Sequence, residues 1–160
     1  MDVFMKFILV IACVIVIALF AYGSYRNFRT QANPSQKIFL KGTVPAKFPD
    51  GFYKGTVKGL NTPWIGKEFN AKEMRGINIF KENEKITKKY HFHLYKGRGL
   101  ADKNLEVIKI DYNLPQNPIW MRFIMDEIVE TGKDQYLGEL HIRLPGVSFA
   151  LGFFTLEKAK

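Results

Sequence analysis

Hydrophobic residues are spread unevenly along the chain, and the first group forms one continuous apolar run. Residues 7–25 contain no charged side chain. At about 1.5 Å per residue, a helix over this run measures roughly 28 Å, close to the hydrocarbon thickness of a bilayer. Lys6 precedes the run, and Arg26 and Arg29 follow it, as is typical of the ends of a transmembrane helix. The pattern predicts a single-pass membrane anchor over residues 1–25.

Two other interpretations of this run stay open. A cleaved signal peptide would use the small residues Ala21 and Gly23 around Tyr22 as its cleavage site. A lipoprotein signal would end at Cys13, but the apolar residues continue beyond that cysteine, which favours the anchor. The basic residues after the run predict a cytoplasmic C-terminal domain by the positive-inside rule, with a periplasmic or extracellular domain as the alternative.

The rest of the chain has a different pattern, in which apolar and polar positions alternate. Residues 26–37 are polar and predict a juxtamembrane linker. Short alternating runs separated by turn residues then follow, which is typical of antiparallel strands. The predicted strands are residues 38–44, 51–58, 64–69, 76–82, 86–95, 105–112, 120–130, 135–144 and 148–157, and residues 117–130 are also compatible with a short helix.

Short turns between successive strands favour a meander. A meander of this size closes into an up-and-down barrel or folds into a sandwich, because an open sheet would leave its edges unpaired. The fold is therefore predicted to be mainly β. It consists of an antiparallel barrel of about eight or nine strands over residues 38–160, preceded by one transmembrane helix.

Several segments of this predicted barrel resemble small bacterial calycin-like proteins, which have lipocalin-like barrels. The segments are residues 49–55, 63–69, 110–113, 117–118, 126–130 and 136–138. The Trp-Ile-Gly-Lys-Glu-Phe stretch that begins at Trp64 is also similar to the core of GXWXG-type domains, with Thr62 in place of the first glycine. The resemblance implies a ligand-binding barrel and brings no catalytic residues.

Composition and charge limit the classes of binding partner that the protein is expected to have. The chain has 24 Lys and Arg against 15 Asp and Glu, a formal net charge of +9. Such a balance suits nucleic acid or anionic lipid, and the membrane anchor makes lipid head groups the nearer partner, so no nucleic acid is expected. The single cysteine, Cys13, excludes an internal disulfide bond.

The candidate ligand-binding residues come from the alternation within the predicted strands. On a strand over residues 120–130, Arg122 and Asp126 share a face with Trp120 and Ile124, and charged groups among large apolar ones suit a cavity with a few polar anchors. Arg122 and Arg143 are the preferred anchors for an anionic head group, with Tyr112 and Asp111 as further candidates. The predicted cavity lining is Phe92, Trp120, Ile124, Leu140, Phe149 and Phe153.

Metal binding and catalysis have weaker support in the sequence. His91 and His93 share one face of a strand, and His141 offers a third ligand, but the apolar residues alternate with the pair and place it on a solvated face. Asp126, Glu127 or His141 are candidate acid or base groups, and no nucleophile motif accompanies them. We expect no metal site, no cofactor and no catalytic residue.

These observations predict a membrane-tethered, non-catalytic binding protein for a small lipophilic ligand, such as a fatty acid or another lipid. Two alternatives stay open. One is an enzyme that acts on a lipid-like substrate with acid and base groups in the barrel. The other is a filled barrel that serves as a structural or interaction module at the membrane surface. The interior volume of the barrel separates the binding protein from the filled module.

Overall fold

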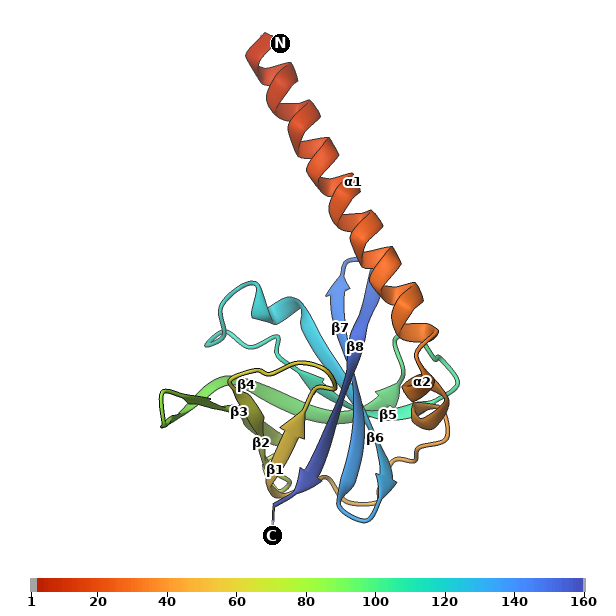
Figure 1. Cartoon of the computed structure of the whole chain (residues 1–160), viewed down its shortest axis with the longest axis vertical. Helices are drawn as coiled ribbons and strands as arrows, with labels where there is room; N and C mark the ends of the chain where they lie inside the picture. The colour runs from red at the N-terminus through yellow and green to blue at the C-terminus, as the bar shows by residue number, and fades with distance from the viewer. Residues whose placement is uncertain (1–2, 160) are drawn as a thin grey trace.

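The computed structural model describes residues 3–159 and shows one long helix rising from a β-barrel (Figure 1). The helices are α1 (Val3–Gln31), α2 (Pro34–Phe39) and the short 3-10 helix η1 (Met121–Phe123). The strands are β1 (Gly51–Thr56), β2 (Trp64–Asn70), β3 (Arg75–Glu82), β4 (Lys85–Arg98), β5 (Glu106–Asp111), β6 (Ile124–Gly132), β7 (Gln135–Leu144) and β8 (Val147–Lys158). The predicted mainly β fold with one N-terminal apolar helix is confirmed.

The eight strands form a closed antiparallel barrel in sequence order. Each strand pairs with the next one, and β1 closes the barrel by pairing with β8 from Tyr53↔Lys158 to Thr56↔Thr155. Closure pairs the first strand with the last and so removes the two end edges of an open sheet, while residues 85–92 of β4 pair with β3 and not with β5. The alternating side chains that point inward form the main hydrophobic core, which includes Tyr53, Phe69, Phe92, Ile110, Tyr136 and Phe154.

Helix α1 is long and apolar enough to cross a membrane. Its last turns lie along β8. The rings of Phe20 and Phe149 meet edge to face with centroids 5.3 Å apart, and the Asn27 side chain accepts a hydrogen bond of 3.0 Å from the Ala150 backbone. The helix therefore continues past the predicted anchor and joins the barrel wall directly.

Most of the predicted linker, residues 26–37, is helical. Helix α2 begins after Asn33, whose side chain caps it by accepting a 2.9 Å hydrogen bond from the Ser35 backbone, and Pro34 occupies the first helical position. The prediction of a strand at residues 38–44 is wrong, because this cap starts a helix that runs to Phe39. Only Thr43 pairs with the sheet there, through an isolated bridge to Glu130.

The strand predicted at residues 120–130 begins later, at Ile124. The carbonyl of Pro118 accepts a 3.0 Å hydrogen bond from the Met121 backbone, and this turn starts η1. Because η1 interrupts the alternation, residues 120–122 do not continue the inward and outward faces of β6. This difference decides where Trp120 and Arg122 lie.

Candidate functional site

A cavity of about 160 Å³ lies inside the barrel. It is lined by Val57, Trp64, Lys67, Asn78, Phe80, Tyr90, Tyr112, Met121, Ile124, Asp126, Leu140 and Phe154. The polar residues of this lining are buried, whereas Phe80, Tyr90 and Ile124 are partly exposed. The cavity therefore has a polar, buried floor and an apolar mouth that opens toward solvent.

Four polar side chains make this floor, three from β2, β3 and β6 and one from the residue directly after β5, and we refer to Lys67, Asn78, Tyr112 and Asp126 as the inner cluster. The Lys67 ammonium group donates to Asp126 Oδ2 at 2.8 Å, to Asn78 Oδ1 at 2.9 Å and to the Tyr112 hydroxyl. The Tyr112 hydroxyl in turn donates to Asp126 Oδ2 at 3.0 Å. Lysine has three ammonium protons, so each one has an acceptor in this cluster.

Aromatic rings enclose the Lys67 ammonium group. Its Nζ lies 5.2–5.4 Å from the ring centroids of Trp64, Phe92, Tyr112 and Phe154. Burial lowers the pKa of Lys67, while the charge of Asp126 and its hydrogen bond act in the opposite direction. Burial, followed by the nearby charge of Asp126, raises the pKa of Tyr112 well above its usual value, so this tyrosine keeps its proton at neutral pH.

One atom of the inner cluster is left without a partner. Asp126 Oδ1 is buried and accepts no hydrogen bond from any residue between 3 and 159. Asp126 lines the cavity, and Lys67 is the only other charged residue of the lining. The floor therefore has no net charge and carries one free acceptor, which fits a neutral molecule with a hydroxyl or N–H group better than an anion.

The predicted binding residues fall into two groups. Phe92, Tyr112 and Asp126 are buried inside the barrel, and the last two line the cavity. Arg122 and Arg143 lie outside it, together in the lining of an external groove. The predicted common face of Arg122 and Asp126 is wrong, because Arg122 belongs to η1 and donates to the carbonyls of two loop residues, Asn117 at 3.0 Å and Pro115 at 2.5 Å.

The other predicted positions also divide between inside and outside. Trp120 is 55% exposed and packs edge to face on Tyr90 at the mouth, with ring centroids 5.4 Å apart. Arg143 pairs with Asp111 at 3.1 Å on the outer surface. Ile124 and Leu140 line the cavity as predicted.

Two residues of the predicted cavity lining were assigned to the wrong side of the wall. Phe149 lies against α1 and Phe153 lies against Phe39 of α2. Phe149 and Phe153 are four positions apart on β8 and both contact the helices outside the barrel, so the inward and outward positions of β8 were assigned the wrong way round. Phe154 faces the interior instead.

Lys67 and Asn78 were not predicted from the sequence, although the alternation of β2 and β3 places both side chains inside the barrel. Lys67 stands two positions before the core residue Phe69, and Asn78 stands two positions before Phe80, which lines the cavity. Because side chains two residues apart on a strand share a face, the side chains of Lys67 and Asn78 are expected to point into the barrel. Both positions were missed because polar residues were not expected at inward positions.

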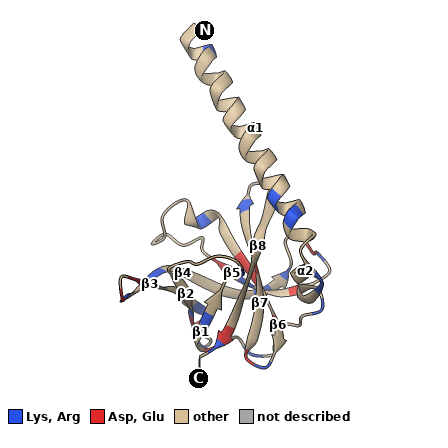
Figure 2. Ribbon diagram, in the orientation of Figure 1, with Lys and Arg blue, Asp and Glu red and all other residues tan. Residues whose placement is uncertain are grey.

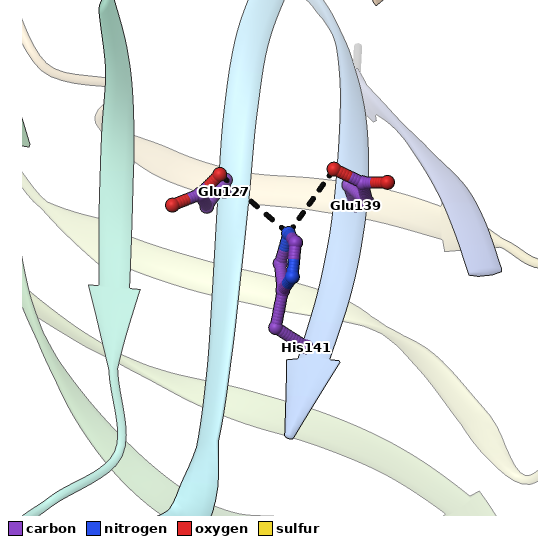
Figure 3. Close-up of side chains that lie close together, drawn as sticks. All are labelled: Glu127, Glu139 and His141. Atoms are coloured by element: carbon purple, nitrogen blue, oxygen red, sulfur yellow. Dashed lines mark hydrogen bonds and ion pairs between the residues drawn. The ribbon is translucent and has the colours of Figure 1, made fainter. Parts of the chain in front are cut away.

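A second buried polar group lies on the outer face of β6 and β7, and we refer to Glu127, Glu139, His141 and Lys109 as the outer cluster. Figure 3 shows the His141 ring between the two carboxylates. His141 Nε2 lies 3.1 Å from Glu139 Oε2 and 3.5 Å from Glu127 Oε2. Lys109 Nζ lies 2.5 Å from Glu127 Oε1. Asp126 and Glu127 are neighbours in sequence, yet they belong to clusters on opposite sides of the wall.

The outer cluster joins the helical segment and a loop to the barrel. The Gln31 side chain at the end of α1 donates to Glu139 Oε1 at 3.1 Å, and the Leu100 backbone donates to both Glu127 oxygens at 2.8 and 3.1 Å. The ligand atoms of Glu127, Glu139 and His141 lie within 4.8 Å of one another, close enough to hold a metal ion. The protein's own donors already use both carboxylates, so the geometry favours a structural ion-pair cluster.

His91 and His93 are exposed on β4, and their register partners are Ile77 and Arg75 of β3. His141 lies on β7 and pairs with β6 and β8. The structure therefore does not bring the three histidines of the chain together. The solvated face predicted for His91 and His93 is confirmed.

Comparison of the chain with protein-family models, curated proteins and solved structures finds no match. The calycin-like resemblance stays a prediction. The residues of the inner cluster and its cavity are therefore the main indication of what the barrel binds.

Proposed function

We propose that this protein is a membrane-tethered, non-catalytic binding protein for a small lipophilic ligand that carries a neutral hydrogen-bond donor. The observation that supports it most is the free Asp126 Oδ1 beside an apolar cavity inside the barrel. A ligand hydroxyl at this oxygen gains a hydrogen bond to a charged acceptor, worth about 1.5–3 kcal/mol. The rest of the ligand contacts apolar side chains such as Phe80, Leu140 and Phe154.

The volume of the cavity limits the ligand. Pockets for drug-sized molecules measure roughly 300–1,000 Å³, whereas a cavity of about 150 Å³ holds one benzene ring. At about 160 Å³, this cavity accepts a ring-sized molecule or the polar end of a longer lipid whose chain leaves through the mouth. Candidate ligands are aromatic alcohols, indoles and lipid alcohols, and a fatty acid fits less well because the floor has no unpaired cation.

The test is ligand binding by the full chain in mild detergent. N-phenylnaphthylamine serves as a fluorescent probe, and matched pairs such as octanol and octanoate compete with it. We expect the alcohol to displace the probe at lower concentration than the carboxylate. Leu140→Trp, which fills the cavity, should abolish probe binding. Ile86→Trp, at an exposed position of β4, should leave probe binding unchanged.

Two results contradict the proposal. One is probe binding that survives Leu140→Trp in a protein with an unchanged circular dichroism spectrum. The other is displacement by octanoate at equal or lower concentration than octanol, because an anion gains nothing from a neutral floor that already carries a carboxylate.

A further inference from the structure

Several exposed apolar side chains gather at the end of the barrel from which α1 rises. They are Ile119, Trp120, Phe123 and Leu144, which together we name the barrel rim. Ile119 is 72% exposed, and Trp120 is 55% exposed. Figure 1 shows the loop that leads into β6, and the tip of β7, at the same end of the barrel as α1. Large apolar side chains left in water at one end indicate a surface that is covered in the functional state.

The charges at this end are mainly positive (Figure 2). Arg122 and Arg143 line the external groove with Ile119, Phe123 and Leu144. The one carboxylate of that groove, Asp111, is neutralised by Arg143 at 3.1 Å. The Arg122 guanidinium group donates only to backbone carbonyls within residues 3–159, so its charge is free to meet an anion.

The length of α1 indicates that a lipid bilayer covers the barrel rim. Residues 7–19, the uncharged part of the helix before it meets the barrel, are exposed throughout and measure about 20 Å. A bilayer has a hydrocarbon core of roughly 30 Å. The helix spans it only when Phe20 and the following residues are also within the bilayer, and Phe20 already contacts Phe149 of β8.

This contact sets the height of the barrel against the membrane. Gly23 lies so close to Phe149 that a Cβ on it would be 2.9 Å from Cδ2 of the ring. Phe149 is two residues from the start of β8, which the Pro145-Gly146 turn joins to Leu144. If the bilayer contains Phe20 and the residues after it, it also reaches the turn between β7 and β8 and the barrel rim beside that turn.

We propose that the barrel rim docks on the bilayer surface, with Ile119, Trp120 and Phe123 in the interfacial layer and Arg122 against anionic lipid head groups. Aromatic and arginine side chains are suited to this layer. The cavity mouth lies next to the rim, because Trp120 packs on Tyr90 and the adjacent Met121 lines the cavity.

The test uses the full chain in vesicles of phosphatidylcholine and phosphatidylglycerol. In a Cys13→Ala background, Ile119→Cys and Lys133→Cys carry a nitroxide label, the second at the turn between β6 and β7. Oxygen and a water-soluble nickel chelate are supplied on both sides of the bilayer. The collision rate of the label with oxygen measures its exposure to lipid, and its collision rate with the nickel chelate measures its exposure to water. We expect an oxygen-to-nickel ratio several-fold higher at position 119 than at position 133.

Tryptophan quenching gives a second readout without a label. The chain has two tryptophans, so Trp120→Phe leaves only Trp64 in the barrel. Brominated phosphatidylcholine should quench the wild type more strongly than Trp120→Phe. The proposal is overturned if position 119 has the same collision ratio as position 133, or if bromine quenches both proteins equally. Dipolar broadening between labels at position 119 would also overturn it, because it shows a second copy on the rim.

Discussion

The inner and outer clusters are both buried ion-pair groups. They differ in whether one of their carboxylate oxygens is left without a hydrogen-bond partner. In the outer cluster, His141 Nδ1 is buried without a hydrogen-bond partner among residues 3–159, but each Glu127 and Glu139 carboxylate oxygen has a protein partner. In the inner cluster, Asp126 Oδ1 has none and lies beside a cavity. Buried charge alone therefore does not mark a binding site. A buried acceptor without a partner, next to open volume, is the more specific sign.

The largest expected effect comes from breaking the inner ion pair. Lys67→Met leaves the Asp126 carboxylate buried and unpaired, and we expect a loss of about 3–5 kcal/mol in the free energy of unfolding. Denaturant titration of the full chain in detergent measures it. The double variant Lys67→Met with Asp126→Leu should recover most of that loss, because it removes both charges.

An exposed lysine provides the control for this comparison. Lys88 pairs with Glu68 on the barrel surface, and Lys88→Met should cost at most about 1 kcal/mol. Equal losses for Lys67→Met and Lys88→Met would show that burial of the inner pair has no energetic weight.

High pH should weaken the inner cluster through Tyr112. Burial and the charge of Asp126 raise its pKa above the usual 10.0. The folded protein then keeps a proton that the unfolded chain releases, so the stability that this tyrosine contributes is complete below pH 10 and falls as pH rises above 10. The difference in unfolding free energy between wild type and Tyr112→Phe should shrink from pH 9 to pH 11, as measured by urea titration. A difference that stays constant or grows over this range contradicts the assignment.

A smaller effect than that of Lys67→Met is expected where the outer cluster meets α1. Gln31→Ala removes one side-chain hydrogen bond to the Glu139 carboxylate, and the expected loss is about 1.5–3 kcal/mol. Binding of the fluorescent probe should not change, because Gln31 is outside the barrel. If Gln31→Ala weakened probe binding as strongly as a substitution in the cavity, the two clusters would not be independent.

Much of the barrel was predictable from sequence, since its inward positions repeat every second residue over most strands. Phe92, Tyr112 and Asp126 were found in this way. The prediction failed where local chemistry overrides alternation: the Asn33-Pro34 cap turned residues 34–39 into a helix, and η1 moved Arg122 out of the barrel. The outer cluster was not predictable, because it depends on which segments cover the outside of the barrel.

The direct contact between α1 and β8 has a mechanical consequence. With Gly23 against Phe149, no flexible hinge separates the helix from the barrel wall. If the barrel rim docks on the bilayer as proposed, the thickness of the membrane would control how far the barrel is drawn toward it. A thick bilayer would then pull the cavity mouth into contact with lipid, and a thin one would leave the mouth in water. Lipid composition would in this way govern ligand exchange without any change in the barrel itself.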